Sequence, residues 1–115
     1  MKDATEIVVS ILSEALEVPV TTEAPAQRPD RLVCVALSGD YSTEYLMRPR
    51  FQIMCWGRSD VDAHCMCLAC VEALWDAALE HPTLSACDLE TMGRDEWSKD
   101  GHARYVAEVD LTINV

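Results

Sequence analysis

Basic residues are scarce in this sequence. Its 115 residues include 9 Lys and Arg against 20 Asp and Glu, which gives a net charge of −11. A protein that grips DNA or RNA needs a basic stripe to displace counterions, and the most basic stretch, residues 48–58, holds only three arginines. We therefore expect no direct binding of nucleic acid by this chain. The acidity indicates solubility, or alternatively a surface past which a nucleic acid moves without binding.

Long apolar runs are also missing. The longest of them, such as residues 7–12, fall far short of the ~20 residues that a membrane span needs. Lys2, Asp3 and Glu6 interrupt the N-terminal segment, where a secretion signal requires a continuous apolar core. We expect a protein that is made and kept in the cytoplasm, with no membrane partner.

Glycine is rare as well. The four glycines are well separated, which excludes a glycine-rich loop that cradles phosphate. No nucleophile elbow is present, and acidic pairs such as Asp60 and Asp62 fit solvated faces better than acid–base chemistry in a chain this acidic. We predict that the chain is not an enzyme and binds no cofactor. The alternative, an enzyme with a reactive thiol, rests only on the presence of cysteine and histidine.

Cysteine, in contrast, is frequent, with six residues. Cys65, Cys67 and Cys70 fall on one predicted helix, whose geometry strains a disulfide between near neighbours, so we expect reduced thiols that act as small hydrophobes. With His64 they form a set of soft ligands that zinc or copper would accept. A helix spreads these side chains around its circumference. We therefore predict that Cys67 and Cys70 fill the core, that His64 points to water, and that no metal is bound; a small metal-binding module remains the alternative.

Apolar residues recur at helical spacing in two segments, residues 3–16 and residues 59–80. Asp3 and Ser59 stand at the first position of each segment, where a side-chain oxygen caps a helix, and each is followed three residues later by an acidic residue. His81 and Pro82 end the second segment. Both helices are predicted to bury one face.

Strand patterns occupy most of the remaining chain. Residues 31–38 are continuously apolar in the middle, as in a strand buried on both faces, and residues 105–115 carry the clearest alternation of apolar and polar residues in the chain. Further strands are predicted at residues 50–56 and 85–92, with a short edge strand at 18–22 and loops at 39–48 and 93–104. The sequence predicts a single α+β domain over residues 1–115: a two-layer sandwich in which two helices cover a mostly antiparallel, four- to five-stranded sheet.

The three tryptophans lie in different contexts. Trp56 ends a predicted strand and Trp75 lies at the edge of the apolar stripe of the second helix, so both are expected to pack. Trp97 stands in a polar loop, where an exposed aromatic side chain is a candidate anchor of an interface. The alternative is a tryptophan that folds back on its own domain.

The order of several short motifs resembles a known family. These motifs are Arg28-Pro29-x-Arg31-Leu32-Val33-x-Val35 ahead of a glycine, Phe51-Gln52-Ile53-x-Cys55-Trp56-Gly57-x-Ser59, Ala63 at the start of the helix core, and Arg104-Tyr105 after a loop with Asp100-Gly101. In order and spacing they resemble the small tail terminator, or tail completion (minor tail), proteins of long-tailed bacteriophages and prophages. The resemblance extends over nearly the whole chain.

This resemblance implies a structural protein without catalysis or cofactor. Such subunits join a homo-oligomeric ring, typically a hexamer, at the head-proximal end of the tail, where they cap the tail tube protein and meet the head connector protein. They assemble in the host cytoplasm and end in the virion tail. Another phage neck or head–tail joining protein is the alternative. We predict that the two long loops carry the contacts, and the candidate interface residues are Tyr41, Tyr45, Arg48, Arg50, Asp95, Trp97 and Arg104.

Overall fold

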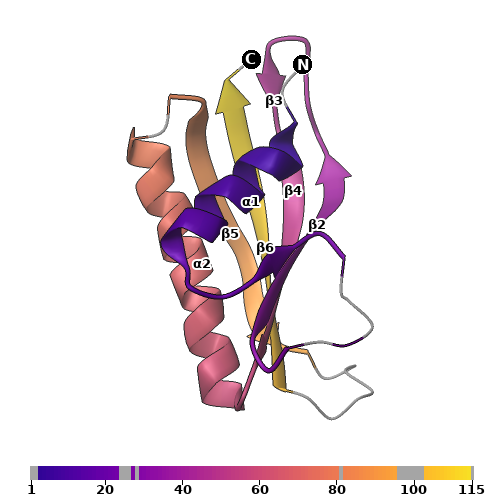
Figure 1. The fold of residues 1–115 in the computed structure, drawn as a ribbon. Coiled ribbons are helices and arrows are strands. Elements are labelled where there is room, and N and C mark those ends of the chain that lie inside the picture. Colours follow the sequence, from indigo (N-terminus) through magenta and orange to yellow (C-terminus); the bar gives the residue numbers. More distant parts are fainter. Residues whose placement is uncertain (1–2, 24–26, 28, 81, 96–102, 115) are drawn as a thin grey trace.

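The chain folds as an α+β domain with two helices and six strands, as the computed structural model shows (Figure 1). It describes residues 3–23, 27, 29–80, 82–95 and 103–114. The elements in order are α1 (Ala4–Ala15), β1 (Val20–Thr21), β2 (Leu32–Asp40), β3 (Leu46–Met47), β4 (Pro49–Gly57), α2 (Asp60–Glu80), β5 (Leu84–Arg94) and β6 (Ala103–Asn114). The predicted α+β class is therefore confirmed. Within the described residues, neither helix is both long and apolar enough to cross a membrane.

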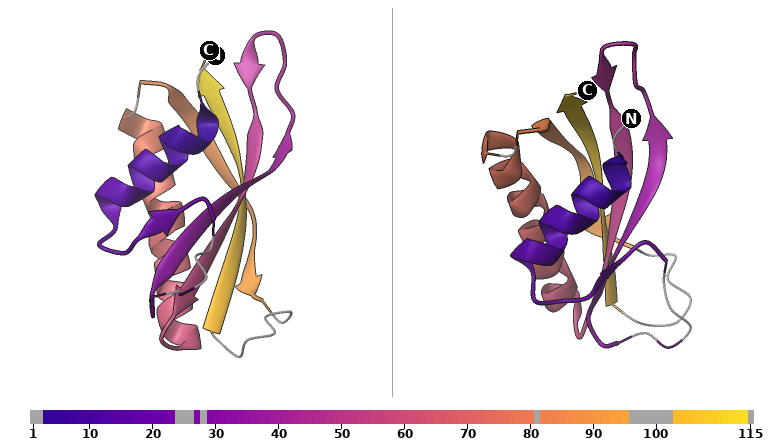
Figure 2. Two further views of the ribbon diagram at one scale, coloured as in Figure 1. Left: turned by 45° about the vertical axis from the view of Figure 1, so that its right-hand side comes forward. Right: turned by 45° about the horizontal axis from the view of Figure 1, so that its top comes forward.

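The sheet has six strands and is mixed and curled, whereas a mostly antiparallel sheet of four or five strands was predicted (Figure 2). β6 pairs with β4 on one side and with β5 on the other, and β4 pairs with β2, all in antiparallel fashion. At one edge, β1 pairs with β2 in parallel, with Val20 opposite Val33. β3 pairs with β6 in the same register as β4 does. The two strands therefore lie in one line along β6, with Arg48 between them. The sequence did not predict β3 because two residues are too few to show a periodicity.

Both helices begin at the predicted capping residues. The Asp3 carboxylate accepts hydrogen bonds from the backbone N–H groups of Thr5 and Glu6, at 3.0 and 3.3 Å. At α2, the Ser59 hydroxyl accepts from the backbone N–H of Asp62 at 3.1 Å. These bonds satisfy donors that a helix start leaves unpaired. Of the residues predicted to end α2, His81 lies outside the described residues.

One hydrophobic core lies between the helices and the sheet (Figures 1 and 2). The alternation predicted for β6 is confirmed, since Ala107, Val109, Leu111 and Ile113 all have exposed fractions of 1% or less. α1, α2 and the strands β2 and β4 contribute further fully buried side chains, among them Val8, Leu12, Val33, Val35, Phe51, Ile53, Cys67, Cys70 and Leu74.

A second, smaller cluster lies on the sheet face that the helices leave open. Leu32 and Cys34 of β2 pack there with Trp56 and Met54 of β4, and the guanidinium of Arg104 lies 5.1 Å from the centre of the Trp56 ring. This cluster explains why β2 is apolar on both faces although helices cover only one. The prediction that Trp56 packs rather than binds is confirmed by its burial.

Candidate interaction surfaces

The predicted loop at residues 39–48 is part of a structured hairpin. We call residues 37–48 the hairpin arm; it comprises the distal half of β2, the connecting loop and β3. Backbone hydrogen bonds join its two sides, from Tyr41 N–H to the Arg48 carbonyl (2.9 Å) and from Thr43 N–H to the Leu46 carbonyl (2.7 Å). Because β3 pairs with the end of β6, the tip of the arm lies at the same end of the sheet as Asn114 (Figure 1).

Short polar side chains shape the tip of the hairpin arm. The Asp40 carboxylate accepts hydrogen bonds from the hydroxyl and the backbone N–H of Ser42, which lowers the pKa of Asp40. The Ser42 oxygen in turn accepts from Arg48 N–H (3.0 Å), and the Thr43 oxygen accepts from the N–H groups of Tyr45 and Leu46. These bonds replace backbone pairing that the loop lacks, so the loop holds a defined shape.

This ordered loop presents apolar side chains to solvent. The exposed fractions are 52% for Leu37, 58% for Tyr41, 78% for Tyr45 and 39% for Leu46. A folded monomer rarely exposes several large apolar side chains next to one another, and such an area commonly marks an interaction site. Tyr41 and Tyr45, both predicted from sequence as interface candidates, are the two most exposed of these four side chains.

Arg50, another candidate, is engaged within the chain on the open sheet face. Its guanidinium donates to both oxygens of Asp110, at 2.5 and 2.9 Å, and lies 3.5 Å from a Glu108 oxygen. It also lies 5.3 Å from the centre of the Tyr41 ring. These hydrogen bonds lower the pKa of Asp110 and raise that of Arg50. Arg50 thus links the hairpin arm to β6, whereas Arg48 is exposed at the base of the arm.

The other predicted interface loop, residues 93–104, begins and ends in strands. Asp95 and Arg104 form an ion pair, and Asp95 N–H donates to the Arg104 carbonyl at 2.8 Å, so these two candidates close the junction between β5 and β6. Their side chains are 9% and 24% exposed, which limits what they offer a partner. The remaining candidate, Trp97, lies outside the described residues.

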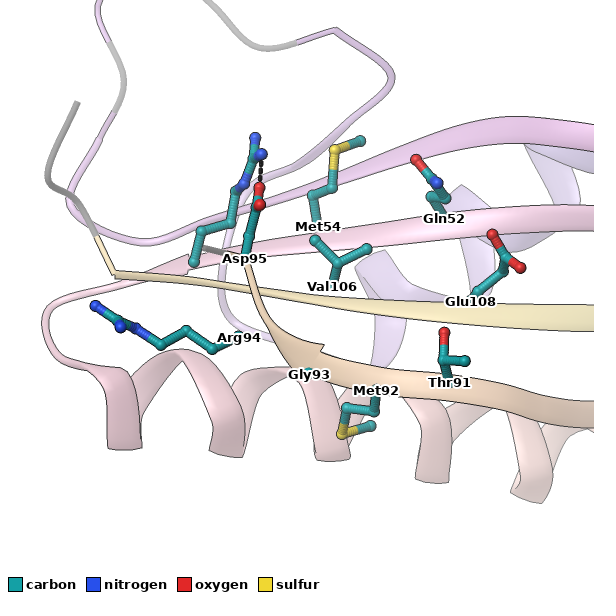
Figure 3. A pocket seen from close by; sticks show the side chains of 10 residues that line it. Gln52, Met54, Thr91, Met92, Gly93, Arg94, Asp95, Val106 and Glu108 are labelled. Carbon is teal, nitrogen blue, oxygen red and sulfur yellow. Dashed lines mark ion pairs between the residues drawn. The ribbon is translucent and has the colours of Figure 1, made fainter. Parts of the chain in front are cut away.

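A shallow groove of about 470 Å³ runs over the open face next to this junction (Figure 3). Gln52, Met54, Val106 and Glu108 project into it from the central strands, while Met92 points toward α2. Its charged side chains are held in ion pairs: Arg94 with Asp60, Arg104 with Asp95, and Glu108 with Arg50. Since these pairs occupy the acids and bases of the groove, we assign it no catalytic role.

The histidine and cysteines that suggested a metal site point in different directions. Cys67 and Cys70 are fully buried beneath α2, as predicted, while Cys65 is exposed. The prediction that His64 points to water is wrong, because its ring stacks on Tyr105 with centroids 4.8 Å apart. Among the described residues, no three His, Cys, Asp or Glu side chains are arranged to hold a metal ion.

Sequence reasoning missed the partner of these thiols. Cys55 of β4 faces α2, and its Sγ lies 3.9 Å from that of Cys70. Hydrogen bonding to Cys67 and Cys70, together with burial, raises the pKa of Cys55. Burial likewise raises the pKa of Cys87, to about 12. A raised pKa favours the neutral thiol, which is a poor nucleophile and metal ligand. No local signal in the sequence could have paired a strand cysteine with a helix cysteine.

A second exposed apolar surface runs along the outer side of α2. It consists of residues spaced four and three apart, which we call the α2 stripe: Val61, Cys65, Leu68, Glu72, Trp75 and Leu79. The Trp75 ring N–H donates to the Cys87 carbonyl at 3.0 Å, yet 45% of the residue remains exposed. Trp75 therefore packs in part, as predicted, and in part faces solvent.

Comparisons with known proteins identify no relative of this chain. Neither the comparison with protein-family models nor the comparison with curated proteins gives a match to this chain. The candidate function therefore depends on the two exposed apolar surfaces, the hairpin arm and the α2 stripe, which lie on different elements of the fold.

Proposed function

We propose that the chain is a structural subunit of a bacteriophage or prophage tail, of the tail terminator type. It self-associates into a ring at the head-proximal end of the tail and joins the tail tube to the head connector. One observation carries this proposal: the ordered hairpin arm exposes four large apolar side chains, Leu37, Tyr41, Tyr45 and Leu46. The motifs that resemble tail terminator proteins give the proposal its biological setting.

The hairpin arm has the properties of an interface anchor. Tyrosine is enriched at interfaces because it buries a large ring at low entropic cost and keeps a polar end for hydrogen bonding. Arg50 is hydrogen-bonded to Asp110 and lies beside the Tyr41 ring. The Tyr41 side chain is therefore positioned before a partner binds. A positioned side chain loses less freedom on binding, which increases affinity.

A ring of more than two copies needs a heterologous interface, in which one patch contacts a different patch on the next subunit. In this proposal the fold acts as a two-layer sandwich, with the helices as one layer and the sheet as the other. The hairpin arm extends the sheet layer and reaches the neighbouring subunit. The open sheet face carries the carboxylates Glu90, Glu108 and Asp110. If it lines the ring, it repels DNA that passes through.

Native mass spectrometry of the purified chain, with and without added zinc, tests the proposal. We expect a closed assembly of more than two copies that does not depend on zinc. The double variant Tyr45→Ser/Leu46→Ser should remain monomeric with an unchanged melting temperature, because both side chains are exposed. Glu44→Ala, a change in the same loop that removes no large apolar side chain, is the matched control and should assemble normally.

Two results would contradict the proposal. A monomer at every concentration would show that the chain alone forms no ring, and equal loss of assembly in the control would show that the apolar contacts are not responsible. A stoichiometric zinc-dependent mass shift would instead favour the metal-binding alternative. Another neck or head–tail joining subunit would use the same arm, so the assembled ring should be tested for binding to purified tail tube and connector proteins.

A further inference from the structure

The α2 stripe is an exposed, largely apolar row, interrupted by Glu72, that lies outside the hydrophobic core. Its six positions follow the spacing four, three, four, three, four, which places them on one side of the helix. Val61 is 73% exposed, Leu68 41% and Leu79 86%. The opposite side of α2 is already buried in the core. A surface helix needs only one apolar face, and the hydrogen bond from Trp75 to Cys87 is the contact that ties this outer stripe to the sheet among the described residues.

The charged side chains of α2 itself are all acidic. α2 contains no lysine or arginine. Its first two carboxylates pair with arginines, Asp60 with Arg94 and Asp62 with Arg31. Farther along the helix, Glu72, Asp76 and Glu80 recur every four residues and therefore form a row.

All three carboxylates in this row are exposed. No ion pair joins any of them to another described residue. A row of carboxylates beside an apolar seam attracts a partner with the opposite charge arrangement.

A hollow on another side of α2 also carries carboxylates. It has a volume of about 410 Å³, and the residues of α1 and α2 that line it include Ile11, Ala15 and Ala77. Glu14 and Glu80 also line it. An apolar lining with carboxylates suits the side chain of lysine or arginine, whose long stem is apolar and whose end is cationic.

We infer that the α2 stripe binds a cationic amphipathic helix of a partner protein. The apolar side of that helix packs on Leu68, Trp75 and Leu79, and its basic flank faces the row formed by Glu72, Asp76 and Glu80. Trp75 is the central anchor, since the hydrogen bond to Cys87 fixes the orientation of its indole ring.

A second copy of this chain fits the stripe poorly. Pairing two α2 helices would bring two acidic rows together without a basic residue on either helix, and like charges across an interface are unfavourable. The inference is independent of the ring proposal, which concerns the hairpin arm.

The test uses a synthetic fluorescein-labelled peptide of about 18 residues, enough to match the stripe at the helical rise. It contains leucine at helical spacing and lysine at the remaining positions. Fluorescence anisotropy measures its affinity for the full chain in about 0.1 M NaCl, where screening still allows charge effects. We expect Leu68→Ser or Leu79→Ser to weaken binding on the order of tenfold, about 1.4 kcal/mol. Glu72→Gln/Asp76→Asn should weaken it about threefold, and less in higher salt.

Matched controls make the inference falsifiable. Glu6→Gln/Glu44→Gln removes the same number of exposed carboxylates elsewhere on the surface and should leave the affinity unchanged. Equal weakening by this control, or equal binding of a scrambled peptide without an apolar face, would reduce the effect to general charge attraction and overturn the inference.

Native mass spectrometry separates this inference from the ring proposal. Leu68→Ser and Leu79→Ser should assemble like the unmodified chain, because they leave the hairpin arm intact. Loss of self-assembly in both folded variants would mean that a second copy occupies the stripe, and this would also overturn the inference. Circular dichroism establishes that each variant is folded.

Discussion

Gly57 joins the end of β4 to the start of α2 where no side chain fits. A Cβ atom placed on this residue would lie 2.4 Å from the backbone nitrogen of Ala63 and 2.8 Å from its Cα. Both are backbone atoms of α2 at Ala63, which is itself fully buried, so they cannot move aside without shifting the helix. At the residue scale, this contact limits how closely α2 can approach the sheet.

The first prediction compares two glycines. Gly57→Ala should lower the free energy of unfolding by about 1–3 kcal/mol through overpacking, as measured by urea denaturation. Gly93→Ala is the matched control, because a Cβ there meets nothing within 4 Å, and an alanine restricts the unfolded chain. It should be neutral or slightly stabilising. Equal losses in both variants would contradict the argument.

At the element scale, the ion pair between Arg50 and Asp110 joins β4 to β6 beneath the hairpin arm. The pKa of Asp110 is lowered in the folded chain, chiefly by the hydrogen bonds from Arg50. This stabilisation is therefore complete above the unfolded pKa of about 4 and is lost as the pH falls through the folded pKa. Glu90 has the opposite sign, since a hydrogen bond to Asp110 raises its pKa, and its contribution is lost as the pH rises through that folded value.

The second prediction follows from these signs. Asp110→Asn should lower the stability by about 1 kcal/mol at neutral pH, the range for a partly exposed ion pair. Urea denaturation across a pH series should show this difference shrinking toward zero in acid, because Asp110 is then protonated in the unmodified chain. Glu44→Gln, which alters an exposed carboxylate on the loop, should show no such trend. A difference that persists in acid would show that the effect of Asp110 is not electrostatic.

At the scale of the whole molecule, the reactivity of the cysteines reports how tightly the helices pack on the sheet. All six are free thiols, five are buried, and they come from β2, β4, α2 and β5. A buried thiol reacts only when the surrounding structure opens. The thiols therefore measure local and global opening of the same domain.

The third prediction concerns their alkylation. In native buffer, iodoacetamide should modify a single thiol per chain rapidly, that of Cys65, which is exposed. The other five should react only as denaturant unfolds the chain, and Cys65→Ser should abolish the rapid phase. Mass spectrometry counts the adducts over time. Rapid modification of Cys55, Cys67 or Cys70 would contradict the closed packing between α2 and the sheet.

Much of the fold was predictable because each element carries its own signal. The capping residues Asp3 and Ser59, and the alternation along β6, reflect interactions between residues close in sequence. The short edge strand predicted at residues 18–22 is confirmed as β1, whereas the two-residue strand β3 was predicted as loop. Short strands depend on partners far along the chain, and a sequence pattern does not record such partners.

The candidate site shows the same division. The sequence by itself determined which residues are apolar, where the helices begin, and that Tyr41 and Tyr45 stand in a polar segment. Only the tertiary structure decided that Arg50 and Arg104 are engaged within the chain, that Cys55 faces Cys70, and that one side of α2 stays uncovered. The physical reason is distance along the chain: local propensity and periodicity act between near neighbours, whereas ion pairs, thiol contacts and exposed faces arise only when distant segments meet.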